Sequence, residues 1–285
     1  MKSRSRGFAI ARRIVLGVLL FLVLLPLVFP LYWMATSGVK TRADIFRFPP
    51  ELVPHPVRLE NITDLFTLAP FAQQYLNSVY IGVANVIGVL VVSSIAGYAF
   101  ARIRFPLRTA LFVLLLTALL MPEEITIVPM VAMMTELGWI GTHLPLLILP
   151  MFTAQAIVGT FLMRQFYLSL PPELEEAGII DGLGRVGLFL RIALPLSGSA
   201  LATLAILSFL GSWNAFLEPL IYLGGRTELL TLPIAIQQFT NFEGAPSWQH
   251  QLAAATLSVI PMFVVFMFAQ RYFIRGIARS GITGS

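Results

Sequence analysis

Residues 14–34 form one unbroken apolar run without a charged side chain. A helix of this length covers about 30 Å, the thickness of the hydrocarbon core of a bilayer, because a helix rises about 1.5 Å per residue. Five more apolar segments are expected at residues 79–101, 111–121, 144–163, 197–217 and 252–269. We therefore predict an all-α polytopic membrane protein with six transmembrane helices.

The third apolar segment is the shortest, because Glu123 and Glu124 interrupt it. The apolar residues 125–134 that follow are too few to span a bilayer alone. We interpret them as an outer-face extension of the third span or as a helix lying in the membrane interface.

The composition agrees with a membrane protein. Of the 285 residues, 57% are apolar and 12% are charged, against roughly 25% charged residues in a typical soluble domain. This excludes an ordinary soluble enzyme, a coiled coil and a disordered chain. The chain has no cysteine, which excludes disulfide frameworks, cysteine zinc sites and thiol catalysis.

The basic residues divide unevenly between the two sides of the predicted spans. The side of the N-terminus holds Lys2, Arg4, Arg6, Arg12, Arg13, Arg102, Arg104, Arg108, Arg164, Arg185, Arg191, Arg271, Arg275 and Arg279. The opposite side holds Lys40, Arg42, Arg47, Arg58 and Arg226. Because cytoplasmic loops are the basic ones, both termini are predicted to be cytoplasmic. The expected parts are a cytoplasmic N-terminus (1–13), the transmembrane domain (14–275) and a cytoplasmic tail (276–285).

The predicted cytoplasmic segment at residues 164–196 does not have the sequence of a loop. A proline pair is followed by three glutamates, as in the first turn of a helix, where the helix dipole favours carboxylates. Gly182 is expected to end this short helix. A second helical run at residues 186–193 is expected to stop before Pro195, because the residue before proline avoids the α conformation.

Several other motifs carry no chemistry. Residues 182–187 match the dinucleotide pattern GxGxxG, but a dinucleotide site needs a preceding strand, so we interpret the glycines as a flexible break. The sequence has no P-loop, and its lysines are Lys2 and Lys40, so any ATPase must be a separate subunit. The three histidines, at positions 55, 143 and 250, lack metal-ligand spacing.

Polar residues within or beside the predicted spans are candidates for lining a path across the membrane. An amide in a bilayer faces the helix bundle or water rather than lipid. The candidate residues of a translocation path are Trp213, Asn214, Asn85 and Gln155. For the last two, hydrogen bonding between helices is the alternative. Trp213 is either a sugar-stacking residue or part of the interfacial aromatic belt.

Residues 176–195 carry a spaced motif that resembles a known one. The motif reads Glu176-Ala177-Gly178, then Gly182, then Ile192-x-Leu194-Pro195. It resembles the EAA loop of the membrane subunits of bacterial ABC importers, EAA-x3-G-x9-I-x-LP, with Gly178 in place of the second alanine. The stretches at residues 213–220 and 270–276 also resemble the six-span sugar permeases of the maltose-transporter type, so the resemblance covers nearly the whole chain.

The resemblance implies a permease subunit of an ATP-driven ABC importer in the bacterial inner membrane. It implies no catalytic activity, no cofactor, and ATP bound by a partner. The implied partners are a second homologous permease, two ATP-binding subunits and an extracytoplasmic solute-binding protein. A coupling helix between spans 4 and 5 would contact the ATPase through Glu175, Glu176, Ala177, Gly178, Asp181, Gly182, Ile192, Leu194 and Pro195. The implied contacts of the binding protein are Gln238, Asn241, Glu243 and Trp248, for which a solvated loop is the alternative.

The solute implied by the resemblance is a sugar or an oligosaccharide, and a glycerol-3-phosphate importer is the alternative within the family. The arginines offer no clear phosphate clamp inside the membrane, which favours a neutral sugar. Outside the family, an ion-coupled secondary carrier is the alternative, but the predicted spans lack a carboxylate pair for it. A membrane enzyme would need an acid–base or metal constellation that the sequence does not have.

Overall fold

The computed structural model describes the backbone of residues 2–240 and 244–280, and the side chains of 12–122, 125–240, 244–268 and 270. The structure is 77% helical. Its described residues contain no β-strand, only an isolated bridge between Thr240 and Pro246, which confirms the all-α prediction. The chain divides into two compact units, Met1–Ala69 with Ile236–Val259 and Pro70–Ala235 with Ile260–Ser285.

The first unit is held together by a buried amide and a buried lysine. It contains α1 (Lys2–Ser37), α2 (Arg42–Ile45), α3 (Glu60–Leu68) and the first part of α15 (Trp248–Ser280). The Asn61 Nδ2 atom donates to the carbonyls of Gly38 and Lys40, at 3.0 and 2.9 Å. The Lys40 ammonium lies 4.2 Å from the centre of the Trp33 ring and donates to the Glu51 carbonyl at 2.6 Å. These contacts offset the cost of burying its charge.

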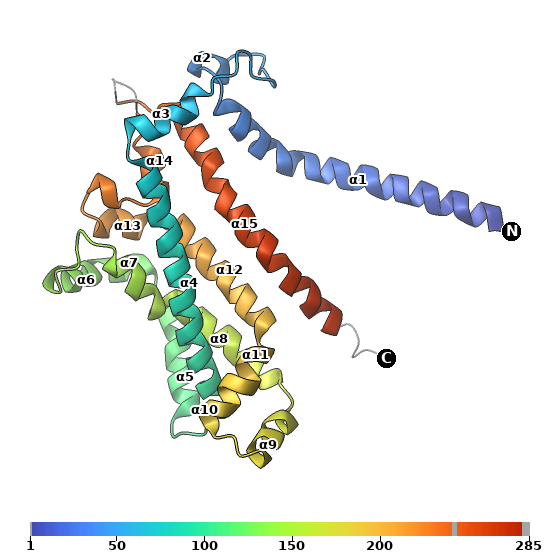
Figure 1. The fold of residues 1–285 in the computed structure, drawn as a ribbon, viewed down its shortest axis with the longest axis vertical. Coiled ribbons are helices and arrows are strands. Elements are labelled where there is room, and N and C mark those ends of the chain that lie inside the picture. The colour runs from blue at the N-terminus through green and yellow to red at the C-terminus, as the bar shows by residue number, and fades with distance from the viewer. Residues whose placement is uncertain (1, 241–243, 281–285) are drawn as a thin grey trace. The chain divides into compact units, whose positions relative to one another are not determined.

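The second unit is built around α4 (Phe71–Arg102), which packs against α8 (Ala154–Ser169) and α12 (Gly198–Asn214) (Figure 1). The helices before α8 are α5 (Arg108–Thr117), η1 (Ala118–Leu120), α6 (Glu123–Glu136), α7 (Leu144–Ile148) and η2 (Leu149–Met151). Between α8 and α12 lie α9 (Pro172–Ile180), α10 (Arg185–Leu188), η3 (Phe189–Ala193) and α11 (Leu194–Leu196). After α12 come α13 (Leu217–Tyr222), η4 (Thr227–Leu229) and α14 (Leu232–Gln237).

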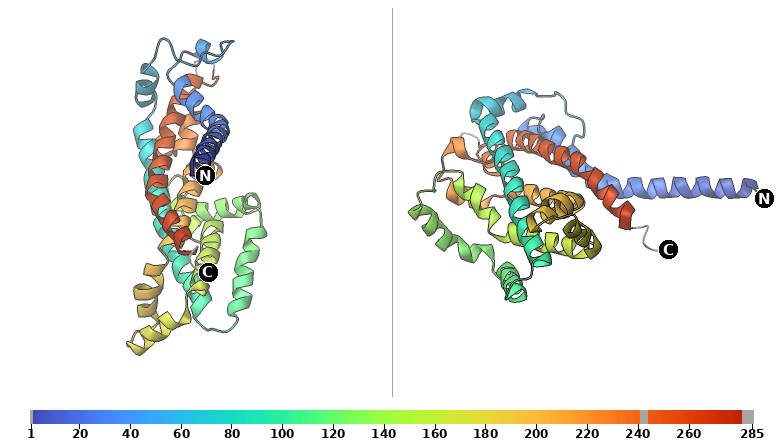
Figure 2. Two further views of the ribbon diagram at one scale, coloured as in Figure 1. Left: turned by 90° about the vertical axis from the view of Figure 1, so that its right-hand side faces the viewer. Right: turned by 60° about the horizontal axis from the view of Figure 1, so that its bottom comes forward.

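Four helices are long and apolar enough to cross a bilayer, judged by length and composition: Arg12–Ser37, Phe71–Arg102, Leu144–Ser169 and Trp248–Phe268. They coincide with the first, second, fourth and sixth predicted spans. The third and fifth predicted spans fall on broken pairs, Arg108–Leu120 with Ile125–Glu136, bent by 102°, and Arg185–Leu196 with Gly198–Asn214, bent by 76° (Figure 2). The apolar residues 125–134 thus belong to a helix of their own, α6.

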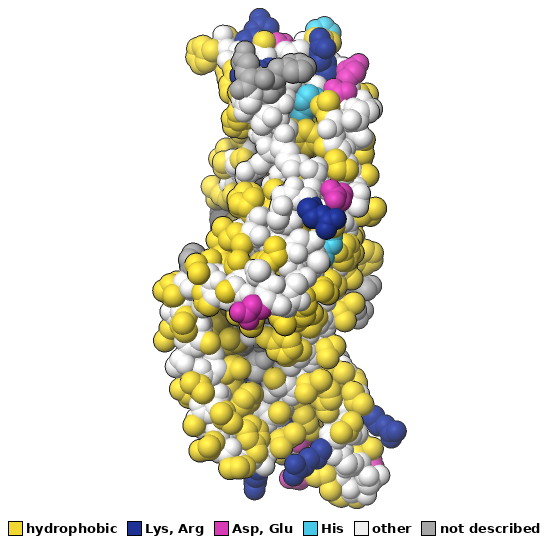
Figure 3. Space-filling view, turned by 90° about the vertical axis from the view of Figure 1, so that its left-hand side faces the viewer, with side chains coloured by type: hydrophobic (Ala, Val, Ile, Leu, Met, Phe, Trp, Pro, Cys, Tyr) yellow, Lys and Arg dark blue, Asp and Glu magenta, His cyan; other side chains and the backbone are white. Residues whose placement is uncertain are grey.

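The second unit has an apolar surface. In the view of Figure 3, hydrophobic side chains cover most of this unit, and Lys and Arg side chains lie at its lower end, where Figure 1 places α9 and α10. An apolar band next to basic side chains is the surface that a bilayer and its polar boundary favour.

The predicted helix stop before Pro195 is wrong. The helix continues through Pro195 to Leu196 and changes direction at Ser197. Residues Phe189–Ala193 form a π-helical turn, in which the Leu194 N–H donates to the Phe189 carbonyl. This wider turn accommodates the proline, which has no N–H to donate and whose ring crowds a regular helical turn.

Small residues let α4 and α8 approach closely. A Cβ atom at Gly97 would lie 2.7 Å from the Met163 Cβ and 2.9 Å from the Arg164 backbone nitrogen. A Cβ atom at Gly159 would lie 2.3 Å from the Ser93 Oγ. Such close backbone contacts are typical of helix pairs in membranes, where packing rather than water drives association.

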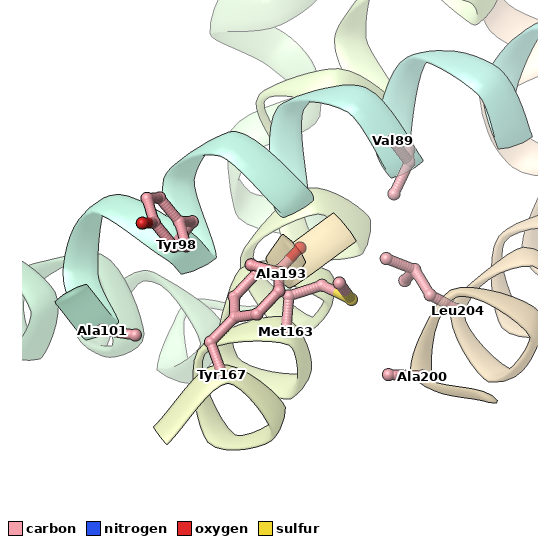
Figure 4. Packing of buried hydrophobic residues seen from close by; sticks show 8 residues of the cluster. All are labelled: Val89, Tyr98, Ala101, Met163, Tyr167, Ala193, Ala200 and Leu204. Carbon is pink, nitrogen blue, oxygen red and sulfur yellow. The ribbon is translucent and has the colours of Figure 1, made fainter. Parts of the chain in front are cut away.

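One end of this interface is filled by a cluster that Figure 4 shows in detail. Tyr98 and Tyr167 meet edge to face, with ring centres 5.6 Å apart. Phe189 packs on both rings. Met163 and Leu204 bring α8 and α12 into the same cluster. The cluster therefore joins α4, α8, α12 and η3.

Gly97→Val is expected to destabilise the protein by about 1–3 kcal/mol, because the new side chain overlaps the α8 backbone, which cannot move aside locally. The measurement is the thermal unfolding midpoint of the purified protein in detergent. Gly17→Val is the matched control, since a Cβ at Gly17 meets no described atom within 4 Å. Equal midpoints for the two variants would contradict the close α4–α8 contact.

Candidate functional site

The segment from Pro171 to Ser197, here called the α9–α11 hairpin, reverses direction at a glycine. Gly182 has a φ of +79°, a conformation that costs other residues about 1–2 kcal/mol. Its N–H donates to the Ile179 carbonyl at 3.0 Å, and the Leu183 N–H donates to the Gly178 carbonyl at 2.9 Å. These bonds satisfy the last carbonyls of α9, so Gly182 ends the helix as predicted.

Gly178 lies where the two arms of the hairpin touch. A Cβ atom there would lie 2.6 Å from Leu188 Cδ2 and 2.7 Å from Ile192 Cδ1. Gly178 is buried although its neighbours on α9 are exposed. Two residues of the spaced motif, Gly178 and Ile192, are therefore packing partners. The motif keeps them at a fixed separation because the chain between them forms the turn that brings the two arms together.

An ion pair fastens the hairpin to the end of α4. The Arg102 Nε lies 3.5 Å from the Glu175 carboxylate, and these side chains are 15% and 19% exposed. The Arg102 guanidinium also donates to the carbonyls of Tyr167 and Leu170 at the end of α8. Arg102 is half-buried and contacts α8 and α9 from its place at the end of α4. It therefore fixes α9 to α4 and α8 more firmly than an exposed ion pair would.

The outer side of the hairpin is apolar and open. Ile179, Ile180 and Val186 are 59%, 85% and 71% exposed. We call these three residues with Leu174, which is 40% exposed, the α9 patch. Leu174, Ile179 and Ile180 lie on α9 and Val186 lies on α10, and exposed apolar residues gathered on one short segment typically mark an interaction surface.

The predicted coupling residues thus fall into two groups. Glu175, Gly178 and Ile192 turn inward and hold the hairpin together or anchor it. Glu176, Ala177, Asp181, Gly182 and Pro195 are exposed, and Leu194 is half-buried.

A cavity of about 690 Å³ lies between α4, α6, α8, α12 and α13. It is within the size range of about 300–1,000 Å³ that is typical of small-molecule sites. Three of the predicted path residues, Asn85, Gln155 and Asn214, line it. The cavity is mostly apolar, with further polar groups at Thr126, Thr153, Ser212, Glu218, Tyr222 and Thr231.

The amides of the cavity wall are incompletely hydrogen-bonded. The Asn85 Nδ2 donates to the Ser212 Oγ at 2.9 Å, but the Asn85 Oδ1 is buried without a partner among the described residues. The Gln155 Oε1 is in the same situation. The Gln155 Nε2 fits against Gly211, where a Cβ would lie only 2.5 Å from it. The Asn214 Nδ2 donates to the Leu210 carbonyl of its own helix at 2.9 Å.

Trp213 does not line this cavity. It is 4% exposed, stacks on Phe209 with ring centres 5.3 Å apart, and meets Tyr75 edge to face at 6.0 Å. Its place on α12 is thus in the packed interior between α12 and α4. Its role on a solute path stays a prediction.

Sequence reasoning missed two polar residues of the wall, Ser212 and Thr231. Ser212 directly precedes the predicted Trp213–Asn214 pair, so helical geometry alone places it near the same end of α12. Thr231 lies just before α14 and reaches the wall only through the tertiary fold. Nothing in its local sequence indicates this position.

The residues predicted to contact a soluble partner belong to the first unit. Gln238 is exposed, and Trp248 is 42% exposed and meets Phe46 edge to face at 6.1 Å. The Ser247 N–H donates to the Phe239 carbonyl at 2.9 Å, which brings together the residues next to Gln238 and Trp248. Asn241 and Glu243 lie outside the described residues. Within the described part of the chain, no three His, Asp or Glu side chains gather as they do in a metal site.

Comparison with known proteins gives one consistent result. Residues 61–279 match the family described as binding-protein-dependent transport system inner membrane component. The sn-glycerol-3-phosphate transport system permease protein of Yersinia pestis bv. Antiqua is 34% identical over 98% of this chain and 99% of its own length. The arabinooligosaccharides transport system permease protein of Halalkalibacterium halodurans is 35% identical over 90% of this chain and 91% of its own.

A solved structure shares the fold. It is a chain of a bacterial ABC transporter involved in the import of the acidic polysaccharide alginate. The TM-score is 0.77 at 21% identity, over 94% of this chain and 97% of the other.

Gly178→Ala is expected to change the free energy of unfolding by less than about 1 kcal/mol. The gain in helix propensity is of that order, and the ends of the Leu188 and Ile192 side chains can shift to admit a methyl group. Gly178→Leu is expected to cost about 1–3 kcal/mol by overpacking. Thermal unfolding in detergent measures both.

Gly184→Leu is the control for the larger substitution, since a Cβ at Gly184 meets no described atom within 4 Å. If Gly178→Leu were as stable as Gly184→Leu, the two arms of the hairpin would not be in contact through Gly178.

Proposed function

Since the chain belongs to the family of binding-protein-dependent transport system inner membrane components, it is a permease subunit of a bacterial ABC importer in the inner membrane, and we propose that its solute is a sugar or an oligosaccharide. The observation that carries the coupling part of this proposal is the α9–α11 hairpin, with its inward anchor at Glu175 and its outward α9 patch. The chain's part in transport is mechanical, and its partner hydrolyses the ATP.

In this proposal the chain crosses the membrane six times. Four crossings are the long apolar helices, and the two broken pairs supply the third and the fifth. An even number of crossings places both termini on one side, and the basic residues of the sequence favour the cytoplasm for it. The α9–α11 hairpin, which links the fourth crossing to the fifth, then faces the cytoplasm.

The ATP-binding subunit docks on the α9 patch. Burying exposed isoleucine and valine side chains provides the binding free energy, about 1.5–3 kcal/mol for each fully buried side chain. Glu176 stands beside this patch on the first turns of α9 and is exposed, so it is available for a polar contact with the same partner. The contacts of Arg102 link α9 directly to α4 and α8. A movement of α9 therefore moves these two helices without first deforming a loop.

The remaining partners follow from the family. A solute-binding protein delivers the solute at the outer face, where Gln238 and Trp248 are proposed to meet it. A second, homologous permease completes the translocation path, and two ATP-binding subunits drive it. This chain contributes the cavity lined by Asn85, Gln155 and Asn214 to that path.

For the solute, the relatives point to two chemistries. One transports arabinooligosaccharides and the other sn-glycerol 3-phosphate. We favour the uncharged saccharide, because the charged side chain among the described residues of the cavity wall is the Glu218 carboxylate, which repels a phosphate. The glycerol-3-phosphate importer is the second candidate.

Ile180→Asp is expected to weaken the complex with the ATP-binding subunit by roughly tenfold to a hundredfold, because it replaces a buried apolar contact with a charge. Ile180 is 85% exposed in the isolated chain, so the substitution does not disturb this chain's own packing. Copurification of the ATP-binding subunit and ATP-driven uptake measure the effect. Glu176→Lys is expected to reduce uptake in the same assay.

The matched control for Ile180→Asp is Phe48→Asp, at a residue that is 92% exposed in the first unit. It receives the same charge on an exposed apolar position that does not belong to the hairpin. Unchanged copurification and uptake in Ile180→Asp would rule out docking through the α9 patch.

The orientation is testable because the chain has no cysteine. A single cysteine introduced as Glu176→Cys is expected to react with a membrane-impermeant maleimide only after spheroplasts are permeabilised. Glu60→Cys, at an exposed residue of α3, is expected to react in intact spheroplasts. Labelling of the two cysteines in the reverse order would overturn the proposed topology.

A further inference from the structure

The cavity wall of the second unit contains buried hydrogen-bond acceptors without donors. Asn85 is 2% exposed, and its Oδ1 has no partner among the described residues, nor has the Oε1 of Gln155. Both residues line the cavity, one from α4 and the other from α8. Most buried polar atoms in native proteins are paired, so two unpaired amide oxygens on one cavity need an explanation.

A third polar group of the same wall is also incomplete. Thr231 is 3% exposed, and its Oγ1 is buried without a partner among the described residues. Glu218 adds a half-exposed carboxylate to the lining. The amide and carboxylate oxygens accept hydrogen bonds, and the threonine hydroxyl both donates and accepts.

We infer that these groups form a solute subsite on this chain, specific for the hydroxyl groups of an uncharged saccharide. The inference rests on the proposed function and deepens it. A saccharide hydroxyl donates to the Asn85 Oδ1 and another donates to the Gln155 Oε1, which removes the cost of leaving these oxygens unpaired. In the present conformation both oxygens are covered, so the side chains turn toward the solute when it enters.

The same wall disfavours a phosphate ester. The oxygens of a phosphate dianion accept hydrogen bonds and do not donate them, so only the hydroxyl groups of the ester can pair with the amide oxygens. The Glu218 carboxylate adds repulsion in a partly desolvated site. A relative that is 34% identical and named for glycerol 3-phosphate therefore does not fix the solute of this chain.

Gly211 gives the subsite its shape. Its missing side chain leaves the space in which the Gln155 amide lies, since a Cβ there would be 2.5 Å from the Gln155 Nε2. Ser212, next to it on α12, holds the Asn85 amide through the 2.9 Å bond to its Oγ. In the present conformation both amides thus contact one turn of α12.

The test is uptake by the complete transporter in proteoliposomes, with its partner permease, ATP-binding subunits and cognate binding protein. The probes are arabinotriose and sn-glycerol 3-phosphate. Asn85→Leu and Gln155→Leu are each expected to reduce arabinotriose uptake per assembled complex by about threefold to tenfold, the effect of one lost hydrogen bond. Gln73→Leu, at an exposed amide of α4 outside the cavity, is the control and is expected to match the unsubstituted chain.

The outcomes separate the subsite from the proposed function. ATP-driven uptake that is equal in the Asn85, Gln155 and Gln73 variants overturns the subsite and leaves the proposed function standing. Uptake of sn-glycerol 3-phosphate in preference to arabinotriose also overturns the subsite. If the unsubstituted complex takes up neither probe and no other saccharide bound by its cognate binding protein, the proposed function is contradicted, and the subsite falls with it.

A second measurement needs neither transport nor a leucine variant that assembles. A single cysteine introduced as Asn214→Cys, at an exposed residue of the cavity wall, is modified with an anionic sulfonatoethyl or an uncharged methyl methanethiosulfonate. Relative to Gln73→Cys, the anionic reagent is expected to react roughly threefold to tenfold more slowly, and Glu218→Gln is expected to reduce this difference. Equal relative rates of the two reagents would overturn the subsite's selectivity against anions.

Discussion

The close backbone contact between α4 and α8 is the constraint on which the rest of the second unit depends. Between helices in a bilayer, lipid is as apolar as a leucine side chain, so association depends on how closely the helices pack. Gly97 and Gly159 remove side chains where the backbones approach, and the Ser93 hydroxyl bonds across the gap to the Ala156 carbonyl at 3.1 Å. Once these two helices are fixed, α12 packs on α4, and the cavity is the space that the three helices and their neighbours leave.

The same pair of helices connects the hairpin to the cavity. Arg102 is the last residue of α4 and binds both Glu175 and the end of α8. Asn85 lies on the same helix about 25 Å away, at a rise of about 1.5 Å per residue. On the other side, the 76° bend at Ser197 joins the hairpin directly to α12, which carries Ser212. In the proposed mechanism, a displacement of α9 would therefore reach the cavity wall along α4 and, across the bend at Ser197, along α12.

Much of this architecture can be predicted from the sequence because its causes are local. Apolar runs predict the long helices, and the prolines and carboxylates before Gly182 predict α9 and its end. The stop before Pro195 is predicted wrongly, because the π-helical turn that admits the proline depends on the packing of Phe189 against Tyr98 and Tyr167. Helix propensity depends on a residue and its neighbours in sequence. It cannot predict a π-helical turn whose formation depends on a tertiary contact.

The candidate site shows the same division. Asn85, Gln155 and Asn214 can be predicted as path candidates, because an amide in an apolar run faces either water or another helix, and the bond from Asn85 on α4 to Ser212 on α12 is of the second kind. Their convergence on one cavity depends on the helix contacts, and so does the place of Thr231. The ring chemistry of Trp213 suggests a contact with a sugar, and this is why the sequence predicts it as a path residue. In the structure it lies one helical turn after Phe209 and stacks on that ring. The helical period, applied to both residues together, favours this packed position.

The residues that reveal the family and those that select the solute are different, because they satisfy different physical demands. Gly178, Gly182 and Ile192 are constrained by the turn and packing of the hairpin, which any solute would require equally. In the proposed subsite, Asn85 and Gln155 are constrained by what enters the cavity, since their amide oxygens have no hydrogen-bond partner among the described residues. A family assignment made through the hairpin is therefore compatible with several solutes. In the proposed subsite, the choice among them depends on a few donor and acceptor atoms in the cavity wall, which are separate from the residues that shape the hairpin.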